Sequence, residues 1–180
     1  VEAVAAQAVD SDAADLDAFL AEAWKVDASK TVKDALVEKI AVIGENLNIR
    51  RFEKVTAENG CVVSYIHRGG RIGVIVEAET SVVNDTVKEA LTNLAMQIAA
   101  LSPKYVSRDE ISEDYIAHEK EILLAQIMND PKESQKPEKV INGMIEGRVN
   151  KELKEICLVD QVYVKAEDGK QSVGKYLEAV

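Results

Sequence analysis

The sequence has few of the residues that reactive, metal-binding or membrane-bound proteins need. Aromatic side chains make up 4% of the 180 residues, and there are only two cysteines and two histidines. Cys61 and Cys157 lie far apart in the chain and form no CxxC motif, which predicts reduced, structural thiols. The histidines and cysteines show no metal-ligand spacing. No apolar run is long enough to span a bilayer, and no signal peptide is recognisable.

Positive charge is also scarce. The chain has 22 Lys and Arg against 32 Asp and Glu, a net charge of −10. Nucleic-acid binding draws its affinity from Lys and Arg, so this balance argues against a direct nucleic-acid partner. An acidic surface is compatible with a basic or mixed protein surface as partner. The hydrophobic fraction of 47% is sufficient for a core, in one domain or two small ones.

Helical patterns dominate the first quarter of the chain. Asp15 is expected to cap a short helix, and Thr31 a second one, with Asp34 placed to complete a capping box. Gly44 is expected to end the second helix. The first six residues resemble the middle of a helix, without a starting Met or a capping residue. We therefore expect the chain to be a fragment of a longer protein.

The hydrophobic periodicity then changes to that of β-strands. Residues 48–55, 61–67 and 71–77 are each predicted to form a strand, and together a meander of three strands. Asn59-Gly60 is typical of a turn, and the glycine-rich segment 68–70 is predicted to join the last two strands as a hairpin.

Long amphipathic helices are predicted for most of the remaining sequence. Asn84 or Asp85 is expected to cap a helix that stops before Ser102. The apolar face of that helix would be Val87, Leu91, Leu94, Ala95 and Ile98. The end of the chain is predicted to be an extended run over 158–165, followed by a final helix that Ser172 leads.

Two further helices, separated by a proline-bounded loop, predict an antiparallel helical hairpin over 109–156. Their inward residues would be Tyr115, Ile122, Leu123 and Ile127 on the first helix, and Val140, Ile141, Met144, Ile145, Val149, Leu153 and Ile156 on the second. The narrow apolar stripes and charged outer faces favour an arm that presents a surface to another protein. A helix pair within an ordinary bundle is the alternative.

No residue pattern predicts catalysis. The glycines at 69–73 precede a strand, whereas a phosphate-binding loop precedes a helix, so we expect a hairpin turn there. His67 lies beside this turn, but the sequence identifies no partner that would orient it as a general base. His118 is expected to be solvated on the polar side of its helix. No Ser-His-Asp or Cys-His arrangement is visible.

Four segments resemble signature sequences of the elongation factor Ts family. They are IGENLNIRR at 43–51, YIHRGGRIGV at 65–74, MIEGR at 144–148 and LVDQ at 158–161. They occur in the order in which that family has them, and they span nearly the whole chain. This combination is far more specific than any one segment alone.

The resemblance implies an α+β fold, with small antiparallel sheets packed against helices and an inserted helical hairpin of coiled-coil type. It divides the chain into the rest of an N-terminal core subdomain at 1–58, a C-terminal core subdomain at 59–108, the inserted hairpin at 109–156 and a return segment at 157–180. Both core subdomains are expected to be incomplete.

The resemblance also implies a function that needs no covalent reaction. That function is guanine nucleotide exchange on elongation factor Tu in the cytoplasm, by protein–protein binding. It implies no cofactor, no metal and no small-molecule substrate. In the family, the counterpart of His67 belongs to the surface that meets the GTP-binding domain. The residues expected to bind the partner are His67, Arg68, Gly69, Gly70, Arg71, Ile72, Gly73, Arg50 and Arg51.

Two departures from the family pattern lower the activity expected of this chain by itself. The N-terminal helical module and the Thr-Asp-Phe-Val-Ala motif of the family are not found in the sequence, so we expect weak or no exchange activity from the isolated chain. One alternative is a homodimerisation or structural module with no exchange activity. A second is a small-molecule enzyme, which requires a pocket that holds perturbed ionisable groups.

Overall fold

A computed structural model describes residues 1–180, and the chain divides into two compact units, Val1–Thr56 and Ala57–Val180. Seven α-helices and two small antiparallel sheets make up the regular structure. This mixed composition confirms the α+β class predicted from the sequence. None of the helices combines the length and the apolar character needed to traverse a lipid bilayer.

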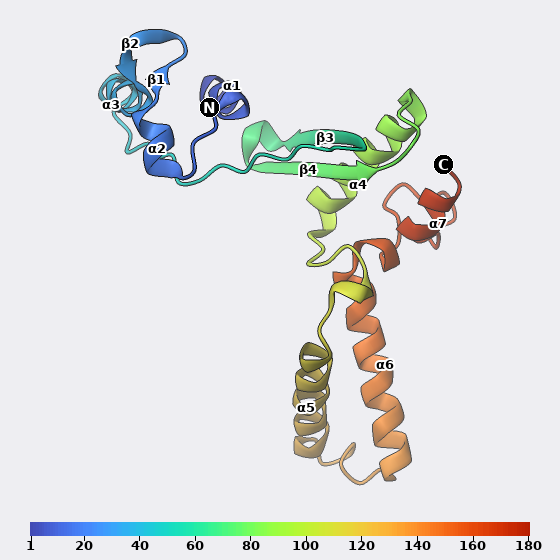
Figure 1. Cartoon of the computed structure of the whole chain (residues 1–180). Coiled ribbons are helices and arrows are strands. Elements are labelled where there is room, and N and C mark those ends of the chain that lie inside the picture. The colour runs from blue at the N-terminus through green and yellow to red at the C-terminus, as the bar shows by residue number, and fades with distance from the viewer. The chain divides into compact units, whose positions relative to one another are not determined.

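The first unit is built around one buried phenylalanine. Phe19 is fully buried and packs with Ala8 and Val32, and its ring lies 4.7 Å from that of Phe52, centroid to centroid. The elements that surround it (Figure 1) are α1 (Glu2–Asp10), α2 (Leu16–Ala21), β1 (Ala23–Trp24), β2 (Asp27–Thr31) and α3 (Val32–Ile43).

The helix ends of this unit form as the sequence predicts. The Asp15 side chain accepts a hydrogen bond of 2.8 Å from the backbone N–H of Ala18 at the start of α2. Thr31 and Asp34 form the complete capping box of α3. Gly44 ends α3 in the left-handed conformation, with φ of 76°, where the lack of a Cβ removes the steric cost.

The strand predicted over residues 48–55 is wrong, because the chain there forms no regular structure. Ile49 and Phe52 both pack against the core of the first unit. Their spacing of three residues suits an irregular segment, since a strand would direct residues an even number apart to the same face. The predicted three-stranded meander is therefore a two-stranded hairpin.

The short sheet of the first unit was not predicted. β1 pairs antiparallel with β2, and the register shifts between Ala23 and Trp24. The β2 sequence, Asp27 to Thr31, is largely polar, and all five of its residues are exposed or half-buried. A strand with no buried face lacks the apolar alternation by which strands are recognised in a sequence.

The second unit begins with a regular β-hairpin that one helix covers. β3 (Gly60–His67) pairs with β4 (Ile72–Glu79) in unbroken register, from Gly60↔Glu79 to His67↔Ile72. The helix α4 (Asp85–Leu101) begins at Asn84, whose side chain accepts from the N–H of Val87 at 2.8 Å. Its buried face carries Leu91, Leu94 and Ala95 and packs with Cys61, Val63, Val76 and Ala78 of the sheet.

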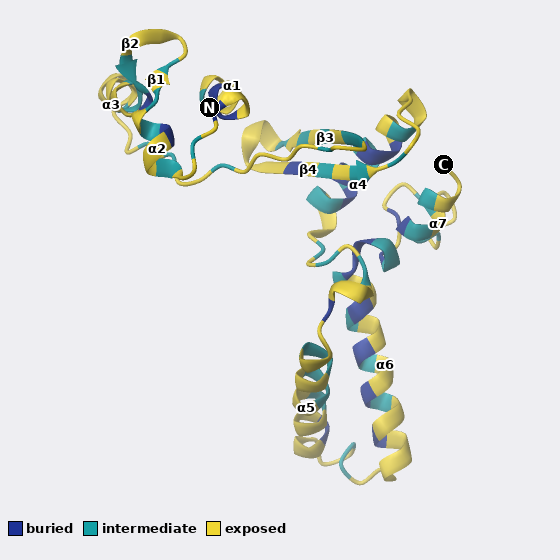
Figure 2. Ribbon diagram, in the orientation of Figure 1, coloured by how far each residue is buried: buried dark blue, intermediate teal, exposed yellow.

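The predicted helical hairpin is confirmed as α5 (Glu113–Asn129) and α6 (Glu138–Ile156). Its core is a separate cluster in which Ile127 is completely buried and Ile141, Ile145, Val149 and Leu153 line the inner side of α6. Figure 2 shows this buried stripe along α6. The prediction that Ile122 and Val140 point inward is wrong, since their side chains are 37% and 46% exposed.

The chain leaves and rejoins the body of the second unit at a single junction. Lys104 and Tyr105 both donate their backbone N–H groups to the Ile156 carbonyl, and Leu158 donates to that of Tyr105 at 2.9 Å. Tyr105 and Cys157 are partners in a parallel bridge. The extended run predicted over 158–165 is partly wrong, since Leu158–Asp160 forms a 3₁₀ turn.

The return segment is anchored by a buried amide. Gln97 of α4 is fully buried, and its side chain donates to Gln161 Oε1 and to the Val162 carbonyl, each at 3.1 Å. Its oxygen accepts from the N–H of Val164 at 2.8 Å. The chain ends in α7 (Val173–Glu178), which Ser172 caps as predicted.

Candidate functional site

The turn between β3 and β4 has a backbone that requires glycine. Residues 68–70 form a short 3₁₀ turn in which φ is 48° at Arg68, 64° at Gly69 and 94° at Gly70. Side chains with a Cβ rarely adopt such values, so the two glycines relieve most of the strain. No atom lies within 4 Å of where a Cβ would stand at Gly69, Gly70 or Gly73. The turn surface is therefore open to a partner.

His67 ends β3 at the edge of this turn, and it has a partner that the sequence analysis missed. The Tyr65 hydroxyl lies 2.9 Å from His67 Nδ1, and the two ring centroids are 5.8 Å apart. Residues two apart in a strand share one face. That spacing was visible in the sequence, and it was the signal that could have identified Tyr65 as the orienting group.

Tyr65 is held in place by the sheet. Its cross-strand partner is Val74, which is buried, whereas His67 pairs with the more exposed Ile72 in the last pair before the turn. Tyr65 and His67 are both half-buried, and Ile66 between them is 70% exposed on the opposite face. The strand thus brings the phenol and the imidazole together at the rim of the turn.

The arginines expected to bind a partner are not used inside the molecule. Of the six arginines in the chain, only Arg108 and Arg148 form ion pairs. Arg68 and Arg71 are exposed on the turn. In a protein with a net charge of −10, this turn is a local basic surface whose guanidinium groups are free to pair with carboxylate, phosphate or carbonyl oxygens.

Arg50 and Arg51 belong to the first unit, so the predicted residues are divided between the two units. Both are exposed in the irregular segment that follows α3. Ile49 on one side and Phe52 on the other pack into the core of the first unit. These two contacts fix the backbone between them and leave both guanidinium groups on the surface. Residues 67–73 belong to the second unit.

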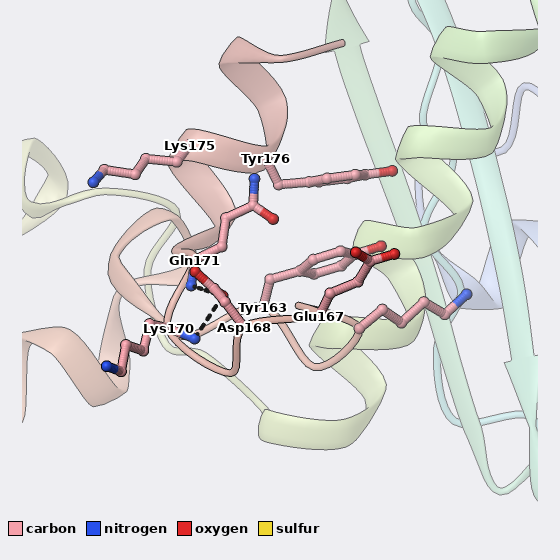
Figure 3. Close-up of a pocket in the computed structure, with 8 residues that line it drawn as sticks. Tyr163, Glu167, Asp168, Lys170, Gln171, Lys175 and Tyr176 are labelled. Carbon is pink, nitrogen blue, oxygen red and sulfur yellow. Dashed lines mark hydrogen bonds between the residues drawn. The ribbon is translucent and has the colours of Figure 1, made fainter.

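A hollow of the surface lies beside α7 and is lined by a pair of tyrosines. The rings of Tyr163 and Tyr176 stack with centroids 4.2 Å apart. Figure 3 shows Lys170 and Lys175 directed away from this pair, and Asp168 in contact with the backbone of its own loop. Burial, and next the Tyr176 hydroxyl, raise the pKa of Tyr163 to about 12. A phenol that stays protonated is no base or nucleophile near neutral pH.

Cys157 does not supply a nucleophile either. Both cysteines are free thiols. Cys157 is completely buried, and that burial raises its pKa, which lowers the fraction of reactive thiolate. No group of three or more His, Cys, Asp or Glu side chains is placed to hold a metal ion.

Comparison with known proteins agrees with the signature segments. The family described as Elongation factor TS matches residues 1–180. Elongation factor Ts of Clostridium novyi (strain NT) is 43% identical over 175 residues, which cover 97% of this chain and 55% of that protein. Elongation factor Ts of Clostridioides difficile (strain 630) is 44% identical over 182 residues, which cover 100% of this chain and 58% of that protein. The chain thus spans a little more than half the length of these relatives.

Proposed function

The chain belongs to the elongation factor Ts family, and from this membership we propose that the protein promotes release of GDP from elongation factor Tu in translation elongation. The proposal covers the complete protein, acting in the cytoplasm where translation takes place. It involves no cofactor and no covalent step. Since the chain spans 55% to 58% of its relatives, it is expected to bind elongation factor Tu more weakly than the complete protein does.

The observation that carries this proposal is the open basic turn. His67, Arg68 and Arg71 lie together on a rigid hairpin, and neither arginine has an internal ion-pair partner. Because the backbone of the turn is already ordered, binding of a partner would restrict the arginine side chains but would not also have to order the backbone. We propose that this turn meets the GTP-binding domain of elongation factor Tu, with Arg50 and Arg51 forming a second contact.

Release of the nucleotide follows from thermodynamic linkage. If the protein binds nucleotide-free elongation factor Tu more tightly than the GDP-bound form, it must weaken GDP binding by the same factor. Each tenfold weakening requires about 1.4 kcal/mol of differential binding free energy. A specific complex of this kind is expected to bury on the order of 1,600 Å² of surface at its interface.

Homodimerisation is the second candidate function, and the exposed face of the β3–β4 hairpin favours it. Val62, Ile66 and Ile75 are 38%, 70% and 50% exposed on the side of the sheet that α4 does not cover. A two-stranded sheet also leaves unpaired backbone groups at its edges, to which another chain can pair. Light scattering over a range of protein concentrations distinguishes the candidates: a stable dimer that does not respond to elongation factor Tu supports the second.

The decisive experiment follows fluorescent GDP as it leaves elongation factor Tu. We would compare this chain, the protein encoded by the complete reading frame, and the latter with His67→Ala or with Arg68→Ala and Arg71→Ala together. The complete protein should accelerate release, and both variants should reduce the acceleration. Lys120→Ala is the matched control, since Lys120 is a basic residue of the helical hairpin, away from the β3–β4 turn in the sequence, and is paired with Glu146. A complete protein that leaves the release rate unchanged would overturn the proposed function.

A further inference from the structure

The hydrogen bond between Tyr65 and His67 can run in either direction, depending on which ring nitrogen of His67 carries the hydrogen. A phenol O–H is a better donor than a phenol oxygen is an acceptor, and an unprotonated imidazole nitrogen is a good acceptor. The arrangement that this chemistry favours has the Tyr65 hydroxyl, 2.9 Å away, donating to Nδ1 of His67. An imidazole that accepts at Nδ1 carries its hydrogen on Nε2. The tyrosine thus selects one of the two tautomers of the neutral ring.

The position of the pair determines what Nε2 can reach. Tyr65 pairs with the buried Val74 across the sheet, and its hydrogen bond with His67 limits rotation of the imidazole. His67 is the last residue of β3, and the exposed turn residues Arg68 and Arg71 flank it. Nε2 is the one ring nitrogen left available to a partner. It would be a hydrogen-bond donor there.

We propose that Tyr65 is a positioning residue for binding of elongation factor Tu, which holds His67 as an Nε2–H donor directed to an acceptor oxygen of the partner. This inference rests on the proposed function and adds the chemistry of the contact. The acceptor would be a carbonyl or carboxylate oxygen of the protein surface. The neighbouring arginines favour the same class of group, because they too have only donors to offer.

Two variants test the proposal. Tyr65→Phe removes only the hydroxyl and keeps the ring that lies beside Val74, so the hairpin should remain folded. Tyr115→Phe is the matched control: it also removes one tyrosine hydroxyl, here bonded to Glu152 at 2.9 Å within the helical hairpin. Circular dichroism and thermal unfolding verify that each variant is folded before binding is measured.

The first readout is the tautomer of His67 in the isolated chain, from two-bond ¹H–¹⁵N correlation spectra of the ring. The unaltered chain should show an unprotonated Nδ1 and a protonated Nε2. Tyr65→Phe should introduce the other tautomer, whereas Tyr115→Phe should not. A His67 ring with its hydrogen on Nδ1 in the unaltered chain would overturn the proposal, and so would a Tyr65→Phe spectrum identical to the original.

The second readout is the affinity for nucleotide-free elongation factor Tu, measured with the protein encoded by the complete reading frame. Tyr65→Phe should weaken binding about fivefold, or about 1 kcal/mol, and Tyr115→Phe should leave it unchanged. In a His67→Ala background, Tyr65→Phe should have no further effect, because the group that it positions is gone. Equal effects of Tyr65→Phe with and without His67 would show an independent role and overturn the inference.

Failure of the proposal and failure of the proposed function give different results. An unaltered protein that does not bind elongation factor Tu removes the proposed function, and with it the partner contact of His67, even if the ring spectra show the expected tautomer. A protein that binds normally but is indifferent to both Tyr65→Phe and His67→Ala retains the proposed function and refutes this inference alone.

Discussion

Arg148 of α6 holds the loop at the end of the helical hairpin: its Nη2 donates to both carboxylate oxygens of Glu133, at 3.0 and 2.8 Å. Glu133 lies between the two helices, in a loop that Asp130 also stabilises by accepting from the N–H groups of Lys132 and Glu133. Arg148 ends one of the four signature segments. Its structural role is therefore to order the hairpin tip.

Arg148→Ala should loosen that tip. Because the pair is half exposed, the loss of global stability should be modest, about 0.5–1 kcal/mol. Amide hydrogen exchange of residues 132–136 should accelerate more clearly, since local opening no longer breaks the ion pair. Lys120→Ala, which removes an exposed ion pair between the same helices, is the control and should leave exchange at the tip unchanged. Unaltered exchange in Arg148→Ala would contradict this role.

Gln97→Met should destabilise the second unit strongly. The substitution keeps the length of a fully buried side chain but removes its three hydrogen bonds, to Gln161, Val162 and Val164. The groups left without partners remain buried, so we expect the free energy of unfolding to fall by about 2–4 kcal/mol. Chemical denaturation measures the change. Gln126→Met, at an exposed position of α5, should change it by less than about 0.5 kcal/mol.

Gly60→Ala should disrupt the start of the β-hairpin. Gly60 has φ of 149°, and a Cβ there would overlap the carbonyl oxygen of Ala78. Backbone strain and the clash together should cost about 2–4 kcal/mol. Gly143→Ala is the contrast, because Gly143 lies within α6 with open space around it. The change Gly143→Ala should stabilise the helical hairpin by about 0.5–1 kcal/mol. Thermal unfolding measures the effects of both substitutions.

Stability should fall at alkaline pH through two tyrosines. The hydrogen bond to Glu152, and then burial, raise the pKa of Tyr115 to about 12 from an ordinary 10.0, and the pKa of Tyr163 is raised to the same level. Between these values the unfolded chain has lost the phenol proton and the folded chain retains it. The free energy of unfolding therefore falls as pH rises from about 10 to 12, by at most about 2 kcal/mol per tyrosine.

Denaturation at several alkaline pH values measures this slope. Tyr115→Phe should reduce it, because the substituted side chain has no proton to lose in either state. A slope that is the same in the unaltered chain and in Tyr115→Phe would show that Tyr115 does not contribute.

The sequence predicted the elements whose apolar residues recur with a clear period. The helical hairpin and α4 have inward residues spaced three and four apart, and each N-terminus that was predicted from a capping residue carries that cap: Asp15, Thr31, Asn84 and Ser172. In these elements local preference and tertiary packing favour the same conformation.

Predictions failed where tertiary contacts decide the conformation. Residues 48–55 have the β-branched and aromatic composition of a strand, but no neighbouring strand pairs with them, and Ile49 and Phe52 instead fill the core beside Phe19. β2 forms although its sequence is polar, because β1 is available to pair with it. Backbone pairing leaves little trace in the sequence of an exposed strand.

The candidate site shows the same limit. The resemblance identified His67 and the arginines of the turn, but it assigned no role to Tyr65. Whether a tyrosine two residues before a histidine contacts it depends on side-chain rotamers, which the neighbouring Val74 and the turn constrain.

Because Tyr105 and Cys157 are bridge partners, the polypeptide departs for the hairpin and comes back at adjacent points. Residues 107–155 could be lengthened by a helical turn, shortened or replaced during evolution, while the hydrogen bonds of Tyr105 with Ile156 and Leu158 persist at the base of the helical hairpin. A different pair of helices could be grafted onto this junction, or a short loop could replace the helical hairpin. Neither change would require a redesign of the sheet or of α4.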